Sequence, residues 1–328
     1  MGGSAAQGSY HAPSAPGTFP VNKLPNFEPL VELYGRLATV VTRAGATYPA
    51  AVKSASAPAT GKLVVEAPEP VQVDGALRRE GQPHLAAVAA RTRAMHDGRV
   101  LSFTRAEAFP VQCAAGGYFD AIATSDSLRA EYLNCTEFEV LARDPLSVLP
   151  MRRIVHQLAA GDPLRSGHGR VAAIGVSVLT TVPVDHSRAV VLGLRSASVA
   201  TDPNQWHVAP SGTLEPGVAD AVNELVEREL SEEVGVRLNV ASSPASRWKV
   251  LGVGFDLLRL RPEICVRIDL HDDEVPESGL RLDEGEFQDS LLLELTRPAI
   301  SEFWRTHPPQ TVTPAAAAAL ALLEHAGP

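Results

Sequence analysis

The chain has 328 residues, a formal net charge of −9 at pH 7, 45% hydrophobic residues and 20% charged residues. This is the composition of a globular protein that is long enough for one large domain or two ordinary domains. The negative net charge does not indicate a basic surface that would bind duplex DNA or RNA, so nucleic acid is not expected as a partner.

Cysteine usage and hydropathy exclude further classes of protein. The three cysteines, Cys113, Cys135 and Cys265, are scattered and odd in number, so they indicate neither a disulfide framework nor a zinc site. No apolar run approaches the roughly 20 residues needed to span a bilayer. The first residues also lack the pattern of a secretory signal. We therefore expect a cytoplasmic protein with no membrane partner.

The first part of the chain is predicted to contain helices and short strands after a flexible tail. Residues 1–25 are rich in Gly, Ala, Ser and Pro, which is typical of a flexible segment. Apolar residues at helical spacing predict helices at 27–44 and 83–97. The remaining elements expected here are a loop at 47–60, a short strand within 62–73 and a strand at 99–103.

An aromatic segment follows at 116–126 and reads GGYFDAIATSD. Its aromatic side chains are predicted to anchor one domain of the protein on the other. As an alternative to this anchoring role, Asp120 and Asp126 are candidates to line the mouth of a pocket.

From Val171 onward the pattern changes to strands, which are predicted from runs rich in β-forming residues. Two β-rich runs surround the turn 183–188, and a short strand at 206–210 leads into a loop that contains Gly212. An Ala- and Leu-rich closing helix is expected at 313–325. The predicted strands of this part are 171–182, 189–194, 206–210, 248–261, 263–269 and 287–295.

The segment 220–234 contains neither Gly nor Pro and is predicted to be an amphipathic helix. Asp220 is a plausible N-cap, and Gly235 stands where a left-handed residue usually ends a helix. The apolar residues at helical spacing are Ala221, Val222, Leu225, Val226, Leu230 and Val234.

Three glutamates of this helix are predicted to share one face. Glu229 and Glu233 are four residues apart, and Glu229 and Glu232 are three apart. Like charges at these spacings repel each other by a few tenths of a kcal/mol per pair. A hard divalent cation reverses that balance, because Mg²⁺ prefers oxygen ligands.

Residues 228–236, Arg-Glu-Leu-Ser-Glu-Glu-Val-Gly-Val, resemble the second half of the Nudix box, R-E-U-x-E-E-x-G-U, where U is aliphatic. This box is the signature of hydrolases that cleave a nucleoside diphosphate linked to another group. The match covers every fixed position: Arg228, Glu229, Leu230, Glu232, Glu233, Gly235 and Val236.

The first half of the box departs from the family pattern. Counting back from Arg228, the family's Glu position falls on Asp220, and seven residues separate Gly212 from Asp220 where the family has five. Counting forward from Gly212 instead places Val218 at the Glu position. We prefer Asp220 with a longer loop, because loops absorb insertions at small cost.

The resemblance implies an α/β fold, the Nudix α/β/α sandwich with a mixed sheet. We expect the Nudix domain at 166–328 and an α+β extension at 26–165. The implied reaction is hydrolysis of the diphosphate linkage of a small-molecule nucleoside diphosphate derivative, such as a nucleotide sugar. Mg²⁺ is the implied cofactor, with Mn²⁺ as an alternative, and a homodimer is the implied assembly.

The resemblance also assigns roles to the box residues. Glu229, Glu232 and Glu233 are the implied magnesium ligands, and one of them can accept the proton of the attacking water. Arg228 is expected to orient a box carboxylate, either Asp220 or Glu229. Gly212 is expected to bring backbone near a phosphate.

Candidate residues outside the box have alternative roles. Arg195 can hold a phosphate or form a surface ion pair, and Trp206 can stack on a base or pack in the core. Glu284 and Glu286 are candidates for a further acidic group, although the acidic loop 271–286 that holds them can also be simply exposed.

Two other functions stay open at this point. The altered spacing between Gly212 and Asp220 is compatible with a catalytically weak Nudix-fold module that senses a nucleotide or binds a protein. A nucleic-acid-binding regulator is disfavoured, because the chain is acidic and has no basic recognition helix.

Overall fold

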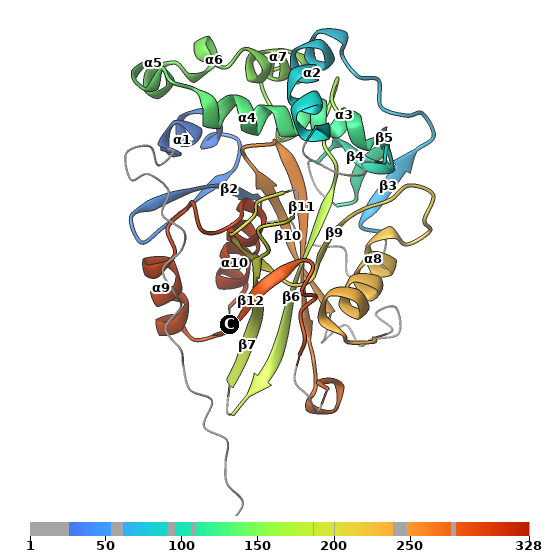
Figure 1. Cartoon of the computed structure of the whole chain (residues 1–328), viewed down its shortest axis with the longest axis vertical. Coiled ribbons are helices and arrows are strands. Elements are labelled where there is room, and N and C mark those ends of the chain that lie inside the picture. Colours follow the sequence, from blue (N-terminus) through green and yellow to red (C-terminus); the bar gives the residue numbers. More distant parts are fainter. Residues whose placement is uncertain are drawn as a thin grey trace, which may run out of the picture.

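A large mixed β-sheet forms the centre of the fold (Figure 1). Its strands are β1 (Thr39–Arg43), β2 (Ala46–Lys53), β6 (Gly175–Val184), β7 (Ser187–Arg195), β8 (Trp206–Val208), β9 (Ser211–Thr213), β10 (Trp248–Asp256), β11 (Arg261–Asp269) and β12 (Phe287–Glu294). The computed structural model of the protein describes residues 26–53, 62–90, 96–106, 109–185, 187–199, 201–238, 248–276 and 280–327.

Within these residues the strand order is β1-β2-β10-β11-β6-β7-β12, and β8 and β9 pair with β7 and β6. The neighbours β11 and β6 run parallel, whereas the other pairs of this sheet are antiparallel. The predicted strands from 171 onward are confirmed, with shifts of a few residues at their ends.

Helices cover both faces of the main sheet. The box helix α8 (Ala221–Glu229), which continues into one π-helical turn (Leu230–Val234), lies on one face, and α9 (Arg297–Thr306) and α10 (Pro314–Ala326) lie on the other (Figure 1). Successive side chains of a strand point to opposite faces of the sheet. On β6, Val178 therefore packs on the side of the box helix, and Leu179 packs on the side of α10. The predicted α/β/α sandwich is therefore confirmed.

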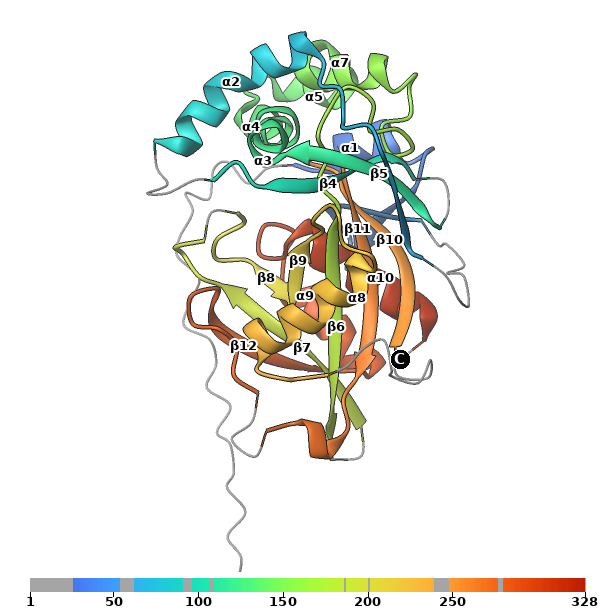
Figure 2. The same cartoon turned by 90° about the vertical axis from the view of Figure 1, so that its right-hand side faces the viewer.

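A second, three-stranded sheet with several helices forms a cap on one end of the main sheet. Figure 2 shows its strands between the cap helices and the main sheet. The strands, in the order β3-β5-β4, are β3 (Val64–Ala67), β5 (Val111–Gly117) and β4 (Arg99–Arg105). The helices are α1 (Glu28–Tyr34), α2 (Gly75–Ala89), α3 (Tyr118–Ala121), a π-turn (Ile122–Asp126), α4 (Ser127–Asn134), α5 (Phe138–Arg143), α6 (Pro145–Val148) and α7 (Pro150–Leu158); a 3₁₀ turn (Asp272–Glu274) lies elsewhere, after β11.

The extension also supplies an edge of the main sheet, which sequence patterns did not indicate. The helix predicted at 27–44 ends at Tyr34, and β1 begins at Thr39. The loop predicted at 47–60 contains β2, which pairs with β10. Alanine- and proline-rich strands such as β2 carry a weak propensity signal, and pairing with a neighbouring strand decides their state. The sheet therefore crosses the boundary predicted at residue 165.

The other predictions for the extension agree in part with the structure. The strands expected within 62–73 and at 99–103 are confirmed as β3 and β4. The helix expected at 83–97 starts earlier, because the Asp74 carboxylate accepts hydrogen bonds from the backbone N–H groups of Ala76 and Leu77. The tail 1–25 lies outside the described residues. No described helix combines the length and the apolar character needed to cross a membrane.

Two buried arginines tie the extension to the turn between β10 and β11. The Arg152 guanidinium donates hydrogen bonds to the carbonyl oxygens of Leu257 and Leu258, each at 2.8 Å. Arg170 donates to the carbonyl oxygen of Leu260 at 2.8 Å. Both side chains are completely buried. The turn is therefore fixed against the extension, next to the cavity described below.

Candidate functional site

A cavity of about 360 Å³ lies between the box helix, the main sheet and the extension. Among the described residues that line it, seven carry carboxylates and three carry guanidinium groups. We call it the acidic cavity. Its charged lining residues are Asp126, Asp202, Asp256, Glu229, Glu233, Glu263, Glu286, Arg195, Arg259 and Arg261.

The box helix forms as its sequence predicts. The Asp220 carboxylate caps its first turn by accepting a hydrogen bond from the backbone N–H of Asn223. Gly235 ends it with a φ of 76°, in the left-handed region that favours glycine. Its apolar stripe is buried against the main sheet. This packing fixes which of its carboxylates face the cavity.

Glu229 and Glu233 both line the acidic cavity, one turn apart on the box helix. Oε2 of Glu233 accepts a hydrogen bond of 3.2 Å from the backbone N–H of Ser211 on β9. A Cβ atom on Gly212 would lie 3.0 Å from Oε1 of Glu229 and 2.9 Å from Leu225, so only glycine lets β9 approach this closely without displacing a neighbour. Gly212 itself lines the cavity.

Glu232 does not share this position. Its side chain is exposed, and it is not among the residues that line the acidic cavity. The reason is the π-helical turn, in which the N–H of Gly235 bonds to the carbonyl of Leu230. A π-helical turn holds more residues than an α-helical turn, so each residue rotates the chain through a smaller angle about the helix axis. The three residues from Glu229 to Glu232 therefore do not complete a turn, and Glu232 points away from the face that carries Glu229.

Burial perturbs the titration of the two cavity glutamates. Burial and, to a smaller extent, the neighbouring Glu229 charge together raise the pKa of Glu233 to about 8. Burial also raises the pKa of Glu229, against the lowering effect of the Arg228 hydrogen bond. The pair therefore retains a proton near neutral pH unless a cation balances its charge.

Arg228 lies at the rim and holds Glu229. Its Nη2 and Nε atoms donate hydrogen bonds of 2.9 and 3.2 Å to Oε1 of Glu229, and Nη1 lies 3.4 Å from Glu215. Of the two carboxylates considered from the sequence, Glu229 is the one that Arg228 contacts, whereas Asp220 bonds to Asn223. Arg228 does not line the cavity.

The candidate residues outside the box divide into two groups. Arg195 and Glu286 both line the cavity and form an ion pair of 3.4 Å. Glu284 is exposed and lies outside the cavity. Trp206 also lies outside it; the indole packs with the α9 and α10 core and contacts the His307 ring edge-on at 5.8 Å. The structure thus places Trp206 in the packing role that was the alternative to base stacking.

Sequence patterns missed a buried arginine at the centre of the lining. The Arg259 guanidinium contacts the carboxylates of Asp126, Asp202 and Asp256 at 3.0, 3.1 and 2.7 Å. Asp126 belongs to the aromatic segment of the extension, so this cluster joins the extension to the sheet. A charged residue between buried leucines of the turn was the available signal, but two of its three partners, Asp126 and Asp202, come from distant parts of the chain.

Two further lining residues, Glu263 and His207, sit on strands. Ser177 donates a hydrogen bond of 2.7 Å to Glu263, and burial raises the pKa of this carboxyl. Nδ1 of His207 lies 2.6 Å from the Thr313 hydroxyl, and burial lowers the pKa of the imidazole to about 3. His207 is therefore neutral in the folded protein at pH 7.

The donor set fits a magnesium site that is completed by substrate. Among the described residues, no group of three or more His, Cys, Asp or Glu side chains is arranged to hold a metal ion by itself. Magnesium is commonly bound by one or two carboxylates, with waters and substrate phosphates as the other ligands. Glu229, which is partly buried, and Glu233, which is buried, supply two carboxylates whose mutual repulsion such a cation would relieve.

No family model and no curated protein matches the sequence. Among solved structures, the NUDIX domain of NrtR from Shewanella oneidensis in complex with ADP-ribose is 17% identical over 58% of this chain and 97% of that chain, with a TM-score of 0.34. A MutT protein from Methanosarcina mazei Go1 is 22% identical over 38% and 77%, with a TM-score of 0.27. An Ap4A hydrolase from C. elegans is 16% identical over 38% and 80%, with a TM-score of 0.26.

Proposed function

We propose that the chain is a Nudix-type, Mg²⁺-dependent hydrolase that cleaves the diphosphate linkage of a nucleoside diphosphate derivative, such as a nucleotide sugar. One observation carries this proposal: two of the three glutamates of a Nudix-like box, Glu229 and Glu233, line a cavity that Arg195 and Arg261 also line. A helix whose acidic face were simply solvated would not direct both carboxylates into such a cavity. Cytoplasmic location and a homodimer stay predictions of the sequence.

The residues of the cavity suit substitution at phosphorus. Glu229 and Glu233 would hold Mg²⁺, which when bound offsets the charge of the phosphate oxygens. Arg195 and Arg261 can each donate hydrogen bonds to phosphate oxygens, although Arg195 must exchange its contact with Glu286. Glu263, buried and with a raised pKa, can accept or donate the proton that the reaction moves.

A second candidate function rests on the position of Glu232. Because this box glutamate is exposed, the cavity receives two box carboxylates where the resemblance implies three magnesium ligands. A site with weakened metal binding would favour a nucleotide-sensing or protein-binding module that binds without turnover.

Turnover separates the two candidates. The purified full chain is incubated with a panel of nucleotide sugars, ADP-ribose and dinucleoside polyphosphates, with Mg²⁺ or with EDTA, and released nucleoside monophosphate is measured. We expect release from some member of the panel only with the metal. Binding by calorimetry without release from any member would favour the sensing module.

A further inference from the structure

A second cavity, of about 510 Å³, adjoins the acidic cavity on the side of α4 and α5. Asp202 and Pro314 line both cavities, so the two share a wall. The polar lining of the second cavity includes four side-chain amides, for which we call it the amide cavity: Asn26, Asn134, Gln205 and Gln310. The extension contributes Asn26 and Asn134, and loops beside the main sheet contribute Gln205 and Gln310.

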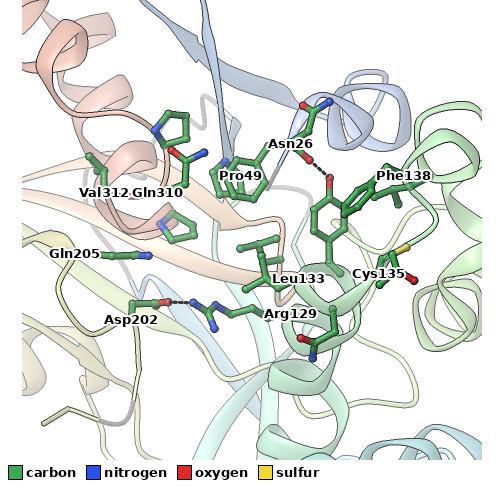
Figure 3. A pocket seen from close by; sticks show the side chains of 18 residues that line it. Asn26, Pro49, Arg129, Leu133, Cys135, Phe138, Asp202, Gln205, Gln310 and Val312 are labelled. Atoms are coloured by element: carbon green, nitrogen blue, oxygen red, sulfur yellow. Dashed lines mark hydrogen bonds and ion pairs between the residues drawn. The ribbon is translucent and has the colours of Figure 1, made fainter. Parts of the chain in front are cut away.

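The amide cavity presents an unusual aromatic surface. Phe138 on α5 lines it and is 54% exposed, although large apolar side chains are normally covered. Tyr132 and Phe27 form a further aromatic wall, with ring centroids 6.2 Å apart. The hydroxyl of Tyr132 is occupied, because it donates a hydrogen bond to the carbonyl oxygen of Asn26 (Figure 3). Phe27 and Tyr132 are buried, so Phe138 is the ring of these three whose face is open to a ligand.

Polar groups complement these faces. Figure 3 shows Gln205 and Arg129 reaching toward the same space from opposite sides. Oε1 of Gln205 and Nε of Arg129 are buried without a hydrogen-bond partner, although Arg129 Nη2 pairs with Asp202 at 3.2 Å. A half-turn of the Gln205 amide exchanges its oxygen and nitrogen, so this side chain can accept from or donate to a ligand. An apolar ligand would leave these groups unpaired.

We propose that the amide cavity binds the nucleobase of the substrate while its diphosphate lies in the acidic cavity; this inference rests on the proposed function. A nucleobase is a flat ring whose faces stack on aromatic side chains and whose edge carries both donors and acceptors. Uncharged amides in an apolar cavity match those requirements. The extension, through Phe138 and Arg129, thereby determines which base is accepted.

Nucleoside binding tests this site without requiring hydrolysis. Adenosine, guanosine, cytidine and uridine are titrated separately into the full chain by calorimetry. We expect at least one of them to bind, with affinity about tenfold lower in Phe138→Ala, which removes a stacking face. Gln205→Leu should also weaken binding about tenfold, because it leaves a polar edge of the base unpaired.

Two matched controls carry the same kind of change outside the cavity. Leu292→Ala removes another exposed large apolar side chain, on β12, and Gln112→Leu replaces an exposed glutamine on β5. Weaker binding in either cavity variant and in neither control supports the proposal. The absence of binding by all four nucleosides overturns it, as does binding that both cavity variants leave unchanged.

Kinetics and nucleoside binding together test the base site and the hydrolase activity separately. If a diphosphate substrate is hydrolysed with the same KM by wild type, Phe138→Ala and Gln205→Leu, the base site is wrong and the hydrolase stands. If a nucleoside binds as described but no diphosphate is cleaved, the base site stands and the hydrolase is wrong.

Discussion

The two adjoining cavities are built from opposite chemistry. The acidic cavity gathers charged groups from strands, the box helix, the extension and loops, whereas the amide cavity gathers uncharged amides and aromatic rings from the extension and nearby loops. They meet at Asp202, which pairs with both Arg129 and Arg259. Under the two proposals above, the acidic cavity would bind the metal and the diphosphate, and the amide cavity would bind the base.

The largest expected effect separates two neighbouring glutamates. Glu233→Gln should lower kcat/KM by about 10²–10⁴, because it removes a carboxylate from the acidic cavity. Glu232→Gln should change it less than about tenfold, because Glu232 is exposed. Steady-state kinetics with Mg²⁺ measures both. Equal losses in the two variants would mean that the box helix turns when it binds metal and substrate.

The stability of the folded protein should depend on Arg259, the cation in the wall between the two cavities. Arg259→Met leaves Asp126, Asp202 and Asp256 without their shared partner, which should cost about 3–5 kcal/mol of unfolding free energy. Urea unfolding followed by circular dichroism measures it. The matched control Arg305→Met affects an exposed ion pair with Glu302 and should leave the midpoint unchanged. Similar midpoints for both variants would show that the cluster adds no stability.

Arg228 should matter to the acidic cavity only through Glu229. Arg228→Gln should lower kcat/KM by about 10–100-fold, as is usual when a partner of a metal ligand is lost. More Mg²⁺ should be needed for half-maximal rate, while nucleoside affinity stays the same. Arg237→Gln, an exposed change just beyond the box, is the control. Recovery of the rate at high Mg²⁺ would support an orienting role. A rise in KM that high Mg²⁺ does not reverse would instead mean that Arg228 contacts the substrate.

The smallest expected effect is a pH dependence of stability from His207. The folded protein keeps this imidazole neutral down to a pH of about 3, whereas the unfolded chain binds the proton near 6.5. The unfolding free energy should therefore fall as the pH drops below 6.5, by about 1–2 kcal/mol at pH 5 from this group. His207→Gln should flatten that slope in urea titrations, and His271→Gln, at an exposed site, should not.

Local rules predicted the box helix and most of the strands. Its apolar spacing, the Asp220 cap and the left-handed Gly235 depend on near neighbours only, so they could be predicted from the sequence. The π-turn could not, because it is a small departure from regular spacing that packing selects. That departure turns Glu232 further from the face that Glu229 and Glu233 share.

The sequence by itself determined the helix that bears the carboxylates, the strand pattern and the resemblance to a diphosphate hydrolase. Tertiary structure alone decided that β1 and β2 complete the main sheet and that Arg259 meets the distant Asp126 and Asp202. It also formed the amide cavity, whose walls come from both ends of the chain. The physical reason is that helix periods and caps act over a few residues, whereas cavities and buried ion clusters depend on which distant segments meet.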